Sequence, residues 1–149
     1  MKHRHQDKII KLCSFLLIIL GFGSCNILPK DEYGTPSADY QVNGRVLSAI
    51  GNNPVKGIKA TISTPENPYE RRDTTYTDAN GEFILIVKNG WPDDPKKLSV
   101  KFEDMDGELN GGTFDTKEFD VIFTNPIYNG KEGNWYQGKA TKEIGDVEI

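Results

Sequence analysis

The sequence predicts an all-β fold, a single antiparallel β-sandwich of about seven strands. Segments rich in Val, Ile, Thr, Tyr and Phe recur along the chain, and clusters of Gly, Pro, Asn and Asp separate them. No window beyond the N-terminal segment has the apolar spacing of an amphipathic helix. Short strands at this spacing pack most readily as two facing sheets.

The first strands follow one another closely. In residues 40–46, successive side chains face opposite sides of the expected strand, and the pattern is that of a strand with one buried face. A turn at residues 51–54 leads into a second strand over residues 55–64. A third strand is expected over residues 72–77.

A turn and an apolar run come next. Residues 78–81 (DANG) form a turn in which Gly81 can take the positive φ that other residues resist. Residues 82–87 continue directly as a run that is apolar enough to be buried on both faces. Together with the strand at residues 72–77, this run predicts a β-hairpin.

The remaining strands lie beyond a Pro-rich, acidic excursion at residues 89–95. Residues 98–102 and 119–123 have the composition of two further strands. The final block, residues 135–149, is expected to close the sheet as an edge strand.

The N-terminus has the pattern of a lipoprotein signal peptide. Four basic residues accompany an apolar run over residues 12–20, and the small residues Gly23 and Ser24 precede Cys25. A retained transmembrane helix is the alternative, but the run is well short of the ~20 apolar residues that cross a bilayer. We therefore expect cleavage before Cys25.

Cleavage there divides the chain into three parts. Residues 1–24 are the signal peptide, residues 25–38 are a polar tether, and residues 39–149 are the β-sandwich domain. Cys25 becomes the first residue and carries lipid on its sulfur. The first expected partner is therefore the membrane.

Charge and composition exclude several classes of function. Without residues 1–24 the chain keeps 14 of its 18 basic and 21 of its 22 acidic residues, a formal charge of −7, which argues against nucleic acid as a partner. The signal peptide removes His3, His5 and Cys13, and lipid occupies Cys25. Neither imidazole nor thiol chemistry is left. We expect no enzyme and no cofactor, with a glycosidase-like pair of carboxylates as the one catalytic arrangement left open.

Three motifs resemble one domain family. They are VNGRV at residues 42–46, NPVKGIKA at residues 53–60 and YTDANGEF at residues 76–83. Their pattern is similar to that of carboxypeptidase-regulatory-like, or transthyretin-like, domains. The resemblance implies the same β-sandwich.

A longer resemblance covers nearly the full chain. The leader, EYGTPSADY at residues 32–40, FEDMDGELNGG at residues 102–112 and WYQGKA at residues 135–140 resemble the radical-SAM-associated lipoproteins of Bacteroidetes. This implies a radical-SAM enzyme as a partner, with the chain as a binding or structural module or as that enzyme's substrate. Residues 30–32 (KDE) are similar to the signal that sends such lipoproteins to the outside of the outer membrane.

An acidic segment is the candidate metal site. Residues 103–110 place four carboxylates and an amide around a glycine, and calcium favours such oxygen ligands. The candidate ligands are Asp104, Asp106, Glu108 and Asn110. Their spacing is not that of an EF-hand, so a solvated acidic loop is the alternative.

Aromatic residues are the candidate ligand-binding site, because their flat faces match sugar rings. The candidates are Trp91, Trp135 and Tyr136, with Tyr69 and Tyr128 as further members. Exposure of these rings together would favour a surface carbohydrate-binding module, which is the alternative function. Burial would favour a structural domain.

Overall fold

The computed structural model describes Lys11, Phe15 and residues 34–149 except residue 66; the side chains of residues 67–71 and 110 are not described. The predicted signal cleavage, Cys25 and most of the predicted tether thus lie outside the described residues. Gly34–Ile149 form one compact unit. Within the described part of the chain, no helix has the length and apolar character needed to cross a membrane.

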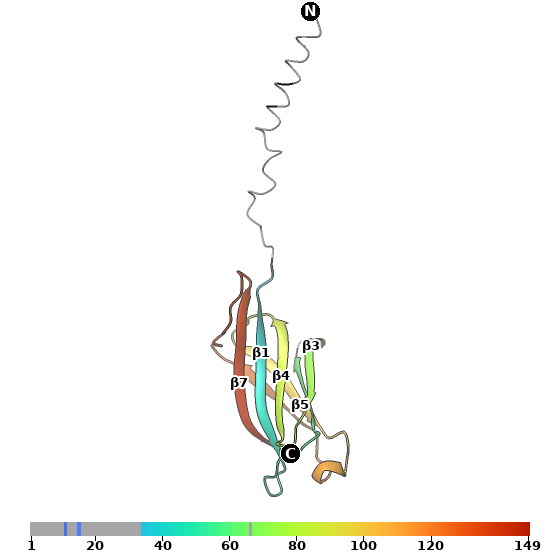
Figure 1. Ribbon diagram of the computed structural model, residues 1–149. Coiled ribbons are helices and arrows are strands. Elements are labelled where there is room, and N and C mark those ends of the chain that lie inside the picture. The colour runs from blue at the N-terminus through green and yellow to red at the C-terminus, as the bar shows by residue number, and fades with distance from the viewer. Residues whose placement is uncertain (1–10, 12–14, 16–33, 66) are drawn as a thin grey trace, which may run out of the picture. The chain divides into compact units, whose positions relative to one another are not determined.

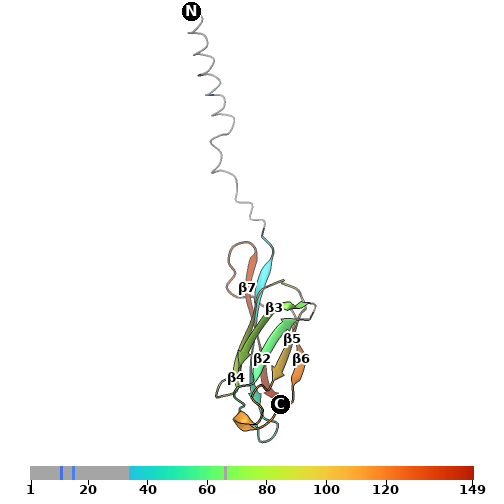
Figure 2. The same cartoon turned by 90° about the vertical axis from the view of Figure 1, so that its right-hand side faces the viewer.

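Two facing sheets make up this unit (Figure 1, Figure 2). One has three strands in the order β4-β1-β7, and the other has four in the order β3-β2-β5-β6. The strands are β1 (Ser37–Leu47), β2 (Lys59–Thr64), β3 (Asn67–Tyr76), β4 (Glu82–Gly90), β5 (Lys96–Glu103), β6 (Lys117–Phe123) and β7 (Tyr136–Glu148), with a short 3-10 helix, η2 (Leu109–Gly111). The predicted all-β sandwich is confirmed.

One strand pair departs from the antiparallel prediction. The final block forms an edge strand as expected, but β7 runs parallel to β1, with Ala140 beside Tyr40 and Val147 beside Val46. The two termini of the domain therefore lie at opposite ends of the three-stranded sheet (Figure 1).

The predicted hairpin of residues 72–77 with residues 82–87 is wrong. β3 belongs to the four-stranded sheet and β4 to the three-stranded sheet. The turn between them carries the chain from one layer to the other. The buried Thr77 hydroxyl holds this crossing, because it donates to the Val55 carbonyl at 2.7 Å and accepts from the Ile58 N–H at 3.0 Å.

The expectation that residues 82–87 are buried on both faces is also wrong. Phe83, Leu85 and Val87 point into the core, while the Ile84 side chain is 55% exposed. The other sheet covers only one face of β4, so the opposite face meets solvent.

Charged side chains close both flanks of the sandwich. Where β6 and β7 meet, Lys142 Nζ donates to the Ile122 carbonyl at 2.5 Å and Lys117 Nζ donates to the Glu148 carbonyl at 2.7 Å. Where β3 and β4 meet, an Asp73 carboxylate oxygen accepts from the Ile86 N–H at 2.9 Å. Such charges on edge strands oppose pairing with further strands.

Tyr40 is fully buried and lies at the centre of a partly buried polar cluster between the sheets. Its hydroxyl donates to the Trp91 carbonyl at 3.1 Å and lies 2.8 Å from the Tyr128 hydroxyl. Lys96 Nζ lies 5.9 Å from the centre of the Tyr40 ring and 2.9 Å from an Asp93 carboxylate oxygen. Burial above all, followed by the Tyr128 hydroxyl, raises the pKa of Tyr40 above its ordinary value of 10.0.

Tyr40→Phe is expected to lower the free energy of unfolding at neutral pH by about 1–3 kcal/mol, because it removes the hydrogen bonds of the Tyr40 hydroxyl to the Trp91 carbonyl and to the Tyr128 hydroxyl. The folded protein keeps the Tyr40 proton at pH values where the unfolded chain loses it. The stability that comes from this group is therefore complete below the ordinary pKa of 10.0 and is lost as the pH rises above it. Urea unfolding at a series of pH values should show the two stability curves converging in alkali, and a constant gap would contradict the assignment.

Candidate functional site

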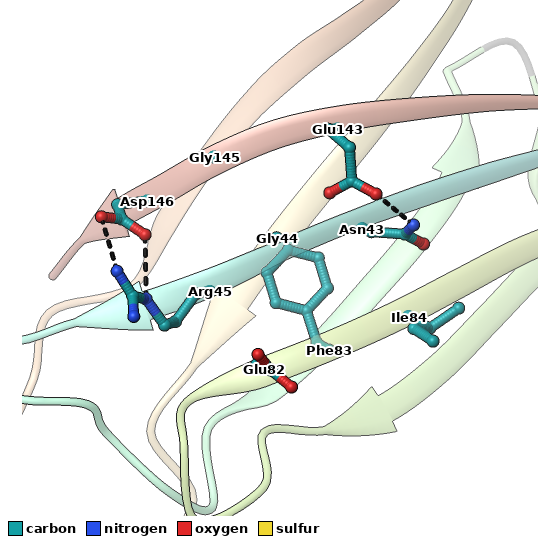
Figure 3. Close-up of a pocket in the computed structure, with 9 residues that line it drawn as sticks. All are labelled: Asn43, Gly44, Arg45, Glu82, Phe83, Ile84, Glu143, Gly145 and Asp146. Carbon is teal, nitrogen blue, oxygen red and sulfur yellow. Dashed lines mark hydrogen bonds and ion pairs between the residues drawn. The ribbon is translucent and has the colours of Figure 1, made fainter.

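A hollow on the solvent face of the three-stranded sheet is the candidate functional site, which we call the outer groove (Figure 3). Its volume is about 370 Å³. The polar side chains that line it are Asn43, Arg45, Glu82, Glu143 and Asp146, the exposed Ile84 adds apolar surface, and Gly44, Phe83 and Gly145 complete the lining.

Strand alternation and one glycine build the groove. Tyr40, Val42 and Val46 of β1 point into the core, so Asn43 and Arg45 point outward. Between these two, Gly44 lets the three strands approach closely. A Cβ at this position would lie 2.8 Å from the Gly145 carbonyl oxygen and 3.0 Å from the Phe83 ring.

A β-bulge in β7 brings an ion pair to one end of the groove. β7 has one more residue than β1 between the Asn43–Glu143 and Arg45–Asp146 pairs, and Gly145 takes a φ of +72° there. Arg45 Nε and Nη2 then donate to the two Asp146 carboxylate oxygens, each at 3.0 Å. The hydrogen bond from Arg45 and its positive charge hold the pKa of Asp146 below the ordinary value of 3.8.

A row of hydrogen bonds orients the other polar groups. Lys139 Nζ donates to Gln41 Oε1 at 2.8 Å, Gln41 Nε2 donates to Asn43 Oδ1 at 2.8 Å, and Asn43 Nδ2 donates to a Glu143 carboxylate oxygen. The side chains therefore have defined directions before any ligand arrives. Among the residues that the structure describes, none forms an ion pair with the Glu82 carboxylate at the rim.

A second hollow of about 290 Å³ adjoins the outer groove and shares Glu82, Phe83 and Ile84 with it. Its other wall includes Tyr76, whose side chain is 57% exposed. The two hollows together place an exposed aromatic ring and an exposed aliphatic side chain next to carboxylates, an amide and a guanidinium.

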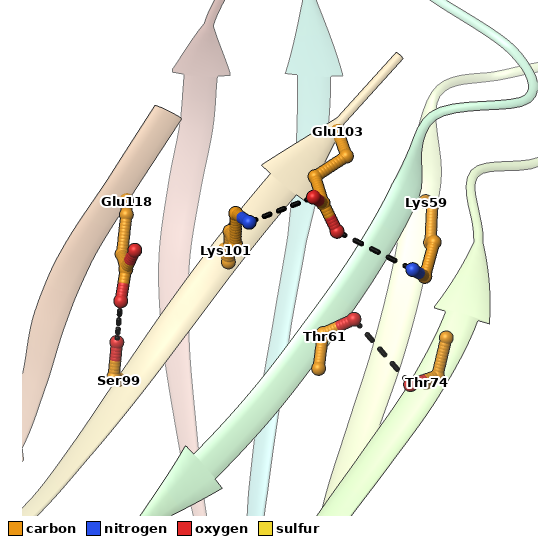
Figure 4. A network of polar contacts seen from close by, with 7 residues as sticks. All are labelled: Lys59, Thr61, Thr74, Ser99, Lys101, Glu103 and Glu118. Carbon is orange, nitrogen blue, oxygen red and sulfur yellow. Dashed lines mark hydrogen bonds and ion pairs between the residues drawn. The ribbon is translucent and has the colours of Figure 1, made fainter. Parts of the chain in front are cut away.

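The solvent face of the four-stranded sheet carries polar side chains that pair with one another (Figure 4). Glu103 accepts from Lys101 at 2.7 Å and from Lys59 at 3.3 Å, and Lys101 is the main cause that lowers the pKa of Glu103. Ser99 donates to a Glu118 carboxylate oxygen at 2.8 Å. The Lys59–Glu103 and Ser99–Glu118 pairs join neighbouring strands, whereas Lys101 and Glu103 pair within β5.

The structure describes three of the four predicted metal ligands, Asp104, Asp106 and Glu108, with their side chains. Within the described part of the chain, no three His, Cys, Asp or Glu side chains gather around one point. The Asp104 carboxylate instead accepts from the N–H groups of Asp106, Gly107 and Phe114 at 3.0–3.1 Å. These backbone hydrogen bonds, led by that of Phe114, lower the pKa of Asp104. Glu108 is exposed, and the side chain of Asn110 is not described. Asp104 therefore shapes the loop through backbone hydrogen bonds, and the choice between a metal site and a solvated acidic loop stays open.

The predicted aromatic candidates lie at the end of the sandwich where β1 begins. Trp91 follows β4 and is 50% exposed, while Trp135 precedes β7 and is 38% exposed. Tyr136 is partly buried, and this burial, followed by the hydrogen bond that its hydroxyl donates to Asp39, raises the pKa of Tyr136. Tyr128 packs edge-on against Tyr40, with ring centres 6.0 Å apart, and the side chain of Tyr69 is not described. The structure shows no stacking among the three predicted ligand-binding residues.

Comparisons with known proteins find few relatives. No model of a protein family and no curated protein matches the chain. Among solved structures, it is similar to the dioxygenase domain of a dioxygenase carbohydrate-binding protein fusion from a Streptomyces species, with 17% identity and a TM-score of 0.41, over 78% of this chain and 84% of that one. A 9R-lipoxygenase from Cyanothece has 18% identity and a TM-score of 0.40, over 73% of this chain and 16% of that one. An intradiol ring-cleavage dioxygenase from Tetranychus urticae has 16% identity and a TM-score of 0.38, over 58% and 52%.

These neighbours correct one expectation from the sequence. The prediction that the protein is not an enzyme is contradicted, because the similar structures are two dioxygenases and a lipoxygenase. At these identities and TM-scores the likeness assigns neither a superfamily nor a reaction to this chain. The resemblance to radical-SAM-associated lipoproteins stays a prediction.

Proposed function

We propose that the mature protein is a lipid-anchored envelope protein whose β-sandwich binds a hydroxyl-rich ligand, a glycan, in the outer groove. The observation that supports this is the combination of oriented polar groups with exposed Ile84 and Tyr76 beside them. Sugars offer hydroxyls to carboxylates, amides and guanidinium groups, and they offer C–H faces to aromatic rings. A volume of about 370 Å³ suits one or two sugar units.

The proposed carbohydrate site differs from the one that the sequence predicted. The sequence pointed to Trp91, Trp135 and Tyr136, whereas the proposed site combines polar residues of β1, β4 and β7 in the outer groove with Tyr76 of β3 in the adjoining hollow. The lipid on Cys25, the outer-membrane location and a radical-SAM partner are proposed from the leader and the motifs of the sequence. Intact mass of the protein from its native membrane tests these features: residues 25–149 plus acyl groups support the anchor, and additional mass supports modification by the partner.

Glycan binding is tested by titrating the lipoprotein in detergent with a panel of oligosaccharides. Glu82→Gln is expected to weaken binding about tenfold, because a hydrogen bond to a charged group contributes about 1.5 kcal/mol or more. Tyr76→Ala is expected to weaken binding as well. Ile122→Ala is the matched control, since Ile122 is 44% exposed on β6, at the opposite edge of the four-stranded sheet from Tyr76, and lines neither hollow. Equal effects of Ile122→Ala and Tyr76→Ala, or binding of no glycan, would refute the site.

A further inference from the structure

Both tryptophans of the chain lie at one end of the domain, where Gly34 leads into β1. Gly90, the last residue of β4, pairs with Ala38, and Tyr136, the first residue of β7, pairs with Ser37. Trp91 and Trp135 therefore flank the start of β1 on its two sides. We call this the N-terminal end; Figure 1 shows it at the top of the domain.

The backbone of both tryptophans is held in place. The Trp91 carbonyl accepts from the Tyr40 hydroxyl at 3.1 Å, and the Trp135 carbonyl accepts from the Ser37 N–H at 2.9 Å. Gly34 lies against the Trp135 indole, since a Cβ there would come within 2.4 Å of the ring. Even so, the Trp91 and Trp135 side chains are 50% and 38% exposed. Two amphipathic rings whose backbone is hydrogen-bonded to β1 thus face solvent.

We propose that the N-terminal end rests on the bilayer that holds the anchor, with Trp91 and Trp135 among the lipid headgroups. The proposal rests on the proposed lipid at Cys25. Only residues 26–33 separate Cys25 from Gly34, and eight residues span about 30 Å at most. Tryptophan favours the membrane interface, where its ring contacts acyl chains and its N–H meets water.

Charge does not explain this contact. The mature chain has a formal charge of −7, so anionic lipids repel it as a whole. Insertion of the indoles is therefore expected to persist when salt screens the charges.

This orientation sets the distance of the outer groove from the membrane. Arg45 lies eight residues beyond Ser37 in β1, which corresponds to about 26 Å along the strand. A domain that stands on its N-terminal end holds the groove well above the headgroups. Long glycans of the surroundings can then reach it without contact with the membrane.

Tryptophan fluorescence of the full lipoprotein in phosphatidylcholine vesicles tests the proposal. Lipids brominated near the headgroup end of their acyl chains quench only indoles that enter the interface. Trp91→Phe and Trp135→Phe variants each leave one native tryptophan, and both are expected to lose most of their emission. For the control, Ile50→Trp is combined with both Phe changes, because Ile50 is 89% exposed beyond the far end of β1. Its emission is expected to stay unchanged.

The outcomes distinguish the proposed docking of the N-terminal end from the proposed lipid anchor. Vesicle flotation and intact mass report the anchor independently of fluorescence. Floating protein in which Trp91 and Trp135 are not quenched overturns the docking and leaves the anchor in place. Equal quenching of the indole in the Ile50→Trp control also overturns the docking and leaves the anchor in place. It would show that the lipids do not distinguish the two ends of the domain. A purified chain without lipid overturns both the lipid anchor and the docking that rests on it.

Discussion

Phe102→Ala is expected to lower the free energy of unfolding by about 3–5 kcal/mol. Phe102 is 1% exposed and lies at the centre of an aromatic group in the core. Its ring meets Phe83 of the opposite sheet edge-on, with centres 5.1 Å apart, and lies 6.0 Å from the Phe119 ring. The change leaves a cavity between the sheets, because tightly packed neighbours collapse only partly.

Urea unfolding followed by tryptophan fluorescence measures this loss. A small domain has a total stability of about 5–15 kcal/mol, so the variant should unfold at a much lower urea concentration. Phe119→Ala is the matched control, because Phe119 is partly buried at the rim of the same group. A loss from Phe102→Ala no larger than that from Phe119→Ala would show that the core is packed differently.

Gly81→Ala is expected to destabilise the crossing between the sheets for two reasons. Gly81 has a φ of +74°, which costs a residue with a Cβ about 1–2 kcal/mol. The new Cβ would also lie 2.4 Å from the Val46 carbonyl oxygen, and backbone there cannot move aside easily. Overpacking of this kind adds about 1–3 kcal/mol.

Gly107→Ala separates these two contributions. Gly107 has a similar φ of +66°, but a Cβ there would meet nothing within 4 Å. Only the cost of the left-handed backbone, about 1–2 kcal/mol, is expected. Equal losses of unfolding free energy for the two variants would contradict the close contact of Gly81 with β1.

Strand composition was enough to predict the sandwich, because each strand must place alternate side chains in the core. Residues 40–46 and 98–102 lie within β1 and β5 as expected, and the final block became the edge strand β7. The hairpin at residues 78–81 was wrong because a turn sequence does not say whether its two strands pair. Thr77, with its contacts to Val55 and Ile58, sends the chain to the other sheet.

The sequence pattern could not predict the outer groove. Asn43 and Glu143 are 100 positions apart, and Arg45 and Asp146 are 101 apart. The parallel pairing of β1 with β7 and the bulge at Gly145 bring these residues together. The outward positions of Asn43 and Arg45 in an alternating strand were the one local signal. In the acidic loop, nearness in sequence brings backbone N–H groups to Asp104, and calcium binding there stays a prediction.

The sequence by itself determined the all-β character of the domain and the alternation of its strands, and it predicts the lipid anchor. These properties depend on local composition and on periodicity, which a single chain displays directly. Only the tertiary structure decided which strands are neighbours, that β7 runs parallel to β1, and that the groove forms on the solvent face of the three-stranded sheet. Those features arise from contacts between residues far apart in the chain, whose energies depend on the packing of both sheets at once.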